Sequence, residues 1–161
     1  MRVTPYTSRR GWQGSTWAMA RYYHDLCAVE KERYRAKLEV VGLRIEDDPY
    51  LPSNAARFLP DMSLWPKIEY GHIFSYFVTR PGTYTQEQLL SWKQLDAYNY
   101  FANGYVRTVL CMIRGSGSSR FCLLKAKVNP SQKSADQAHE PWITAKPNGQ
   151  IISAHCTCMA G

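Results

Sequence analysis

The feature that most constrains the fold of this chain is a change of residue periodicity at Asn103-Gly104. Before this point apolar residues recur at helical spacing, and after it apolar and polar residues alternate as they do in strands. The strand-like part contains two expected hairpins, one across residues 115–119 and one across Pro147-Asn148-Gly149. The sequence therefore predicts an α+β fold, in which N-terminal helices precede a four-strand antiparallel meander.

We divide the chain into three segments. Residues 1–16 lack periodicity and are predicted to form a loose arm, residues 17–103 a helical region, and residues 104–161 an antiparallel β region. Residues 17–41 contain no Gly or Pro and many good helix formers, and Gly42 can end a helix there. Their apolar face shifts at the polar residues 30–33, so the segment is either one long helix or two.

Two further helices are expected before the change of periodicity. Residues 68–80 are predicted to form a short helix, with a strand as the alternative because the run is rich in β-branched and aromatic residues. The residues that this helix should bury are Ile73, Phe74, Phe77 and Val78. A capping-box pattern at Thr85 and Gln88 opens the next helix, which runs to Ala102. This helix is apolar on much of its surface, so we expect it to pack into the core.

The second strand of the first hairpin, residues 120–128, has two different faces. One face is wholly apolar and is predicted to lie against the core; it carries Cys122, Leu124, Ala126 and Val128. Lys125 and Lys127 should then point away from the core. Residues 129–140 are predicted to form a polar linker between the two hairpins.

The composition indicates a single folded domain inside the cell. Of 161 residues, 45% are hydrophobic and 13% aromatic, which is too many for a disordered chain. No apolar run of about 18 residues and no secretory signal are present, so we expect no membrane segment. Five cysteines at irregular spacing argue against a disulfide framework and favour the nucleus or cytoplasm. Three of them are predicted to be buried: Cys27, Cys111 and Cys122.

Positive charge is concentrated in the β region. The net charge is +7, and residues 104–135 contain six basic residues and no acid. Such a field is typical of a phosphate-binding surface, with solvated charge on a sheet as the alternative. The predicted nucleic-acid-binding residues are Arg107, Arg114, Arg120, Lys125, Lys127 and Lys133. Four aromatic residues flank this basic region: Tyr98, Tyr100, Tyr105 and Trp142. They would either stack on nucleic-acid bases or belong to the core. The acidic residues 46–48 are predicted to form a solvated turn.

Cys156 and Cys158 are the candidate metal ligands. They lie two residues apart at the end of the last predicted strand, so their side chains should point to the same side. One zinc ion can bind both thiolates, but a structural zinc site requires four ligands, usually Cys or His. His155 would point to the opposite side and is a poor third ligand. The pair is therefore predicted to be half of a zinc knuckle, with ordinary buried cysteines as the alternative.

The residues around this pair carry a resemblance to a known family. SAHCTCMAG, residues 153–161, resembles the first half of a SWIM-type zinc finger, whose pattern is Cys-x-Cys, a short gap and Cys-x-His. Over residues 34–161 the chain is similar to animal SWIM proteins that often carry a YqaJ-type viral recombinase nuclease domain. The segments that carry this similarity are residues 48–52, 65–106 and 125–132. Only Cys156 and Cys158 match the family's zinc ligands, so the chain resembles a member truncated within the finger.

The resemblance implies a non-catalytic, zinc-binding module that contacts DNA or protein, with Zn²⁺ as cofactor at an incomplete site. The alternative is the N-terminal part of a YqaJ-type DNA exonuclease or recombinase protein that lacks its catalytic domain. The sequence contains neither a nucleophile–base signature nor a phosphate-binding loop, so we predict no enzymatic activity. Oligomers are expected only if two chains share the ligands of one zinc ion.

Overall fold

A four-stranded antiparallel sheet organises the chain. The computed structural model describes residues 22–79, 96–130 and 137–158. The sheet has the order β1-β2-β3-β4, with β1 at Val106–Arg114, β2 at Phe121–Val128, β3 at Trp142–Ala145 and β4 at Ile151–His155. β1 pairs with β2 and β3 pairs with β4, so both predicted hairpins and the α+β class are confirmed.

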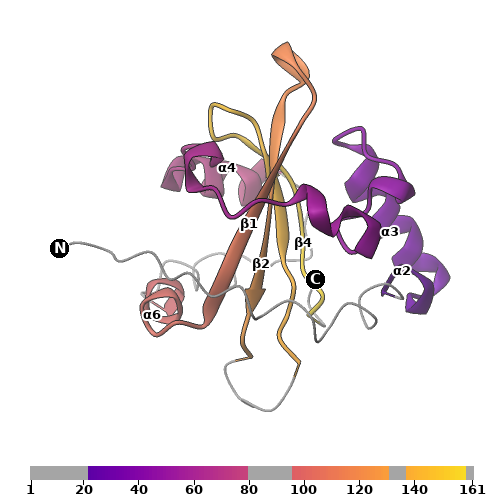
Figure 1. Cartoon of the computed structure of the whole chain (residues 1–161), viewed down its shortest axis with the longest axis horizontal. Helices are drawn as coiled ribbons and strands as arrows, with labels where there is room; N and C mark the ends of the chain where they lie inside the picture. The colour runs from indigo at the N-terminus through magenta and orange to yellow at the C-terminus, as the bar shows by residue number, and fades with distance from the viewer. Residues whose placement is uncertain (1–21, 80–95, 131–136, 159–161) are drawn as a thin grey trace.

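Helices lie on both faces of the sheet (Figure 1). Helices α2 (Tyr22–Asp25) and α3 (Ala28–Glu39) lie on one side, and α4 (Tyr70–Thr79) lies on the other. Short 3-10 turns connect them: η1 (Ile45–Asp47), η2 (Pro52–Arg57) and η3 (Met62–Leu64). Helix α6 (Asp96–Ala102) leads into β1. No helix in the described ranges is both long and apolar enough to cross a membrane.

The ends of the helices show which sequence signals were informative. The segment of residues 17–41 is interrupted, because α2 ends at Asp25 and α3 begins at Ala28, whereas residues 30–33 lie inside α3. Gly42 ends α3 in the left-handed conformation, with φ of 70°. Gly104, with φ of 73°, follows α6 in the same way. Both predicted helix ends are therefore confirmed.

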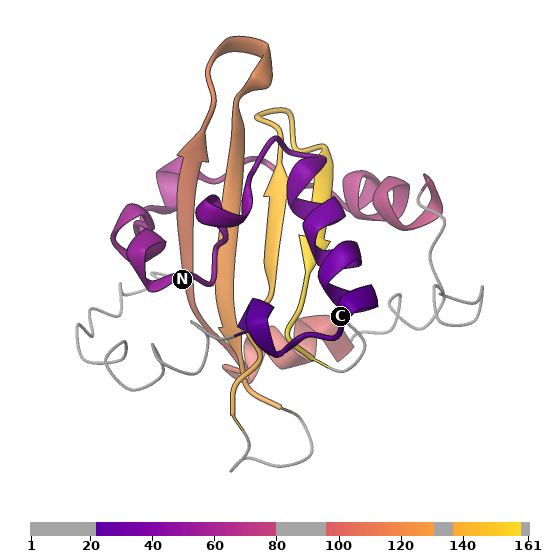
Figure 2. The same cartoon turned by 90° about the vertical axis from the view of Figure 1, so that its right-hand side faces the viewer.

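The core lies between α3 and one face of the sheet (Figure 2). Tyr34 and Leu38, one helical turn apart on α3, are each 1% exposed, since residues four apart lie on the same side of a helix. They pack with buried residues of the first three strands: Leu110, Met112, Phe121, Leu123 and Trp142. The last strand, β4, adds the half-buried Ile152 and the His155 ring, whose centre lies 4.7 Å from that of Tyr34. The Ser153 hydroxyl of β4 also donates a 2.9 Å hydrogen bond to the Lys37 carbonyl of α3.

The predicted orientation of β2 is wrong. Leu123 is fully buried in the core under α3, and Lys125, on the same face, is only 6% exposed. Cys122 and Leu124 therefore face the other side of the sheet. Both faces of β2 carry apolar residues, so alternation alone did not identify the core face. The lysine is tolerated inside because a buried carboxylate, Glu140, lies 2.8 Å from its Nζ.

Three other burial predictions are also corrected. Residues 70–79 form a helix, as predicted, but Phe74 and Val78 of α4 are exposed rather than buried. Phe101 at the end of α6 is 65% exposed, so this turn does not pack into the core. Thr85 and Gln88, which should open that helix, lie outside the described residues. Cys27 is exposed at the N-terminus of α3, where it forms a capping box with Glu30.

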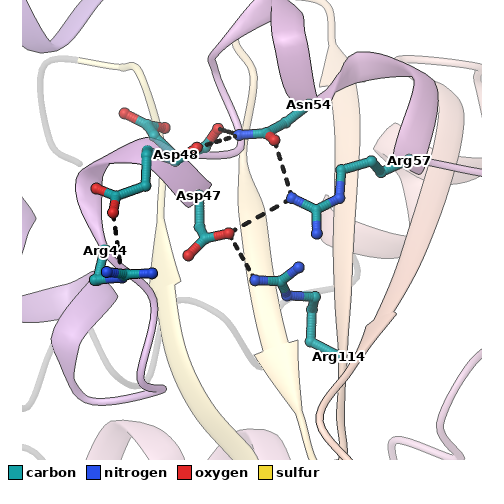
Figure 3. A network of polar contacts seen from close by, with 7 residues as sticks. Arg44, Asp47, Asp48, Asn54, Arg57 and Arg114 are labelled. Carbon is teal, nitrogen blue, oxygen red and sulfur yellow. Dashed lines mark hydrogen bonds and ion pairs between the residues drawn. The ribbon is translucent and has the colours of Figure 1, made fainter.

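The prediction of a solvated turn at residues 46–48 is right for the exposed Glu46 and wrong for Asp48, while Asp47 is half-buried. Asp48 is 1% exposed and accepts hydrogen bonds from the Tyr34 hydroxyl at 2.7 Å and the Tyr50 amide at 2.8 Å. Asp47 lies between Arg57, at 3.5 Å, and Arg114 of β1, at 2.6 Å (Figure 3). Asp48 therefore ties the loop to α3 through Tyr34, and Asp47 ties it to β1 through Arg114.

Candidate zinc half-site and basic surface

The two candidate zinc ligands lie just beyond the end of β4. The strand ends at His155, so Cys156 and Cys158 belong to a bend that follows the strand. The backbone N–H of Cys158 donates to the Cys156 sulfur at 3.3 Å. Both cysteines are half-buried. The backbone therefore bends at Thr157, so that the amide of Cys158 faces the Cys156 sulfur.

The state of the Cys156 thiol follows from its surroundings. Burial, together with a hydrogen bond between the neutral thiol and the Cys158 side chain, raises the pKa of Cys156 to about 12. The amide of Cys158 acts in the opposite direction because it donates to the sulfur and favours the thiolate. Without metal, Cys156 is therefore a neutral thiol near pH 7, and zinc binding at this residue would release a proton.

His155 is part of the core and does not extend the ligand set. Its Nε2 lies 2.6 Å from the Tyr22 hydroxyl, and its Nδ1 lies 3.2 Å from Lys37 Nζ. An ammonium group can only donate, so we assign Nδ1 as the acceptor and Nε2 as the protonated nitrogen. Burial and, to a smaller extent, the charge of Lys37 lower the pKa of His155 to about 3. The imidazole is therefore neutral, and both its nitrogens are engaged.

Thr157, between the two cysteines, contacts a residue that the sequence placed in a polar linker. The backbone N–H of Glu140 donates to Thr157 Oγ1 at 2.9 Å. Glu140 is only 3% exposed, and its carbonyl accepts a 2.5 Å hydrogen bond from the Tyr50 hydroxyl. Sequence reasoning missed Glu140 because its partner Lys125 was assigned to the solvent face. A buried lysine requires a counter-charge, which is the signal that would have indicated an inward acid.

The ligands that complete a zinc site are not found among the described residues. Within residues 22–79, 96–130 and 137–158, no group of three or more His, Cys, Asp or Glu side chains could hold a metal ion. Cys111 and Cys122 are buried, as predicted, and the Cys111 thiol hydrogen-bonds to backbone carbonyls of Leu59 and Asp61. Cys156 and Cys158 would therefore provide two ligands at most, and a four-coordinate zinc site would require two more from elsewhere.

The six basic candidates do not form one surface. Arg107, near the start of β1, and Arg120, at the end of the β1–β2 turn, are exposed. The β1–β2 turn projects from the rest of the sheet (Figure 2). The two arginines lie toward opposite ends of the hairpin, separated by more than about 20 Å if β1 rises 3.4 Å per residue. Arg114 forms an ion pair with Asp47, and Lys133 lies outside the described residues. Lys125 is buried, and Lys127 is half-buried with its Nζ 3.7 Å from Glu140.

The aromatic residues beside the basic ones divide in the same way. Trp142 is 1% exposed and belongs to the core, which confirms the alternative interpretation for this residue. Tyr100 is 43% exposed and makes an edge-to-face contact with Tyr105, with ring centroids 5.2 Å apart. The side chain of Tyr98 is not among those that the structure describes. Among the aromatic candidates whose side chains are described, Tyr100 and Tyr105 therefore form the accessible pair near Arg107 in sequence.

The site is thus defined by the chain's own residues: two half-buried thiols after β4, a neutral buried histidine before them and a threonine anchored between them. Of the six basic candidates, Arg107 and Arg120 are the exposed ones within the described part of the chain, and both belong to the β1–β2 hairpin and not to the β4 edge that precedes the thiols. Comparisons of the chain with protein-family models, with curated proteins and with solved structures gave no significant match.

Proposed function

We propose that this chain is a non-catalytic binding module in which Cys156 and Cys158 supply two ligands of a SWIM-type zinc site. The observation that carries the proposal is the N–H···S bond of 3.3 Å from Cys158 to Cys156 at the end of β4. Two sulfur ligands in one tight turn suit a soft, tetrahedral metal site. The other two ligands would come from outside the described residues or from a second molecule.

We propose that the partner is a nucleic acid, with a protein surface as the alternative. Arg107 and Arg120 are the candidates for phosphate contacts, because both are exposed. The buried Lys125 would have to leave its ion pair with Glu140 to reach a phosphate, so we exclude it from the contact surface. Tyr100 and Tyr105 would stack on an unpaired base.

Zinc titration tests the metal function. Since two ligands hold zinc weakly, we expect the isolated chain to bind it with low affinity, and Cys158→Ser to abolish that binding with almost no change in melting temperature. Cys27→Ser is the matched control, because Cys27 is exposed on another element and should leave zinc binding unchanged. Tight one-to-one binding by the monomer would contradict the half-site, and a zinc-dependent loss of several degrees in Cys158→Ser would show a site that is already structural.

Salt-dependent DNA binding tests the partner. Arg107→Ala and Arg120→Ala should each weaken binding to single-stranded DNA and reduce the slope of log K against log salt by about 0.7. Lys67→Ala is the control. Lys67 carries the same charge, its side chain is 88% exposed, and it lies outside the β1–β2 hairpin. Equal effects of all three changes would indicate a non-specific charge effect and not the proposed surface.

A further inference from the structure

We infer that Thr157 is a positioning residue for the two thiols, held in place by the buried backbone of Glu140. This inference rests on the proposed zinc function and adds a residue that is not itself a ligand. Thr157 Oγ1 accepts the Glu140 N–H at 2.9 Å and so links the bend that carries both cysteines to the segment before β3. The two segments are 17 residues apart in sequence, so this contact is a tertiary one.

Glu140 is fixed on several sides, which makes it a rigid anchor. Its carbonyl accepts the Tyr50 hydroxyl at 2.5 Å, and its carboxylate lies 2.8 Å from Lys125 Nζ and 3.7 Å from Lys127 Nζ. Lys125 in turn donates to the Pro49 carbonyl at 3.1 Å. A hydrogen bond to this residue therefore transmits the rigidity of the core to Thr157.

The anchors alternate with the candidate ligands along the chain. His155 is held by Tyr22 and Lys37, on the side of α2 and α3, while Thr157 is held by Glu140. Cys156 therefore lies between two residues that are tied to the core, and Cys158 follows the second of them. Fixing His155 and Thr157 restricts Cys156 between them and the start of Cys158 after them, and a preorganised site loses less conformational freedom when a ligand binds.

The reactivity of the thiols tests this role directly. Thr157→Val keeps the β-branched shape but removes the acceptor, and Thr157→Ser keeps the acceptor. We expect Thr157→Val to increase iodoacetamide alkylation of Cys156 and Cys158 about five- to tenfold, the factor that corresponds to one lost hydrogen bond. Thr157→Ser should restore the wild-type rates. Unchanged rates in Thr157→Val would overturn the inference.

Two other cysteines serve as internal references in the same samples. Cys27 is exposed and should react at the same rate in every variant, whereas Cys111 is completely buried and should stay protected. Faster alkylation of Cys111 would show that Thr157→Val has unfolded the chain. In that case we would compare hydrogen exchange of the Glu140 backbone amide in wild type and in Thr157→Ser, which keeps the hydroxyl acceptor. Equal protection of this amide supports its hydrogen bond to the residue-157 hydroxyl. Loss of protection in the serine variant opposes it.

Cobalt titration separates this inference from the zinc function. If wild type shows thiolate-to-cobalt charge transfer, Thr157→Val should bind cobalt about five- to tenfold more weakly, and Thr157→Ser should bind it as wild type does. Equal cobalt affinity in Thr157→Val would refute positioning for the metal. If wild type shows no charge-transfer band, the zinc function fails, while the alkylation rates still decide whether Thr157 holds the thiols.

Discussion

The buried ion pair between Lys125 and Glu140 gives the sharpest test of how this fold is held together. Their side chains are 7% and 4% exposed, and the two charged atoms lie 2.8 Å apart. Glu140→Gln removes the negative charge but keeps the backbone N–H and carbonyl that contact Thr157 and Tyr50. The variant therefore removes the ion pair of the buried Lys125 and, with it, the longer 3.7 Å contact to the half-buried Lys127.

The magnitude follows from the neighbours that remain around Lys125. Removing one member of a buried pair costs about 3–5 kcal/mol, chiefly through the uncompensated charge that stays inside. Lys125 would keep its 3.1 Å hydrogen bond to the Pro49 carbonyl and its position 4.9 Å from the centre of the Tyr50 ring. We therefore expect the lower end, about 3 kcal/mol, which corresponds to a fall in melting temperature of about 6–12 °C for a chain of this length.

Urea denaturation at constant pH measures this loss. Lys125→Met combined with Glu140→Gln should recover most of the stability, because no buried charge then lacks a partner. Glu69→Gln is the control, since the Lys67–Glu69 pair has a similar distance of 3.1 Å but is exposed to solvent, and its loss should be hardly measurable. A single Glu140→Gln variant as stable as wild type would refute the argument and show that water reaches Lys125.

Two further predictions concern pH and backbone conformation. Burial raises the pKa of the Asp48 carboxyl above its ordinary value, so its contribution to stability is present at low pH and is lost as pH rises through the folded-state pKa. The urea midpoint of Asp48→Asn, measured against that of wild type at the same pH, should therefore increase as pH is raised above 3.8. A decrease of this difference with pH would show that the pKa of Asp48 is lowered instead. Gly149→Ala should destabilise by about 2 kcal/mol or more, since φ is 90° and a Cβ would lie 2.3 Å from the Lys67 carbonyl oxygen. Gly117→Ala, with φ of 54° and open space around it, should cost only about 1 kcal/mol in the same melting experiment.

The sequence predicted the parts of the fold that depend on local interactions. The two hairpins and the helix ends at Gly42 and Gly104 follow from turn chemistry and from periodicity within a few residues. The errors arose where a partner lies far away in sequence. Lys125 points inward because Glu140 neutralises it, and no local pattern in residues 121–128 records that carboxylate.

The candidate site follows the same division. The spacing of Cys156 and Cys158 made them visible as candidate ligands, but their anchors could not be read from the sequence. Thr157 is held by Glu140, whose own position depends on Tyr50, 90 residues earlier. Burial of Asp48 likewise depends on the Tyr34 hydroxyl, which an acidic run before a proline does not reveal. Tertiary hydrogen bonds of this kind appear only when the elements are assembled.

The contact between Tyr22 and His155 has a consequence for the order of folding. The two residues are separated by 133 positions, whereas the four strands pair only with their neighbours in sequence. Pairing between neighbouring strands closes short loops and can form early, while docking of the N-terminal helices closes nearly the whole chain and carries a larger entropic cost. During synthesis Tyr22 is made long before β4, so its hydroxyl can meet the His155 imidazole only after that strand has been made. The thiols next to that imidazole therefore gain their native surroundings only at this late step.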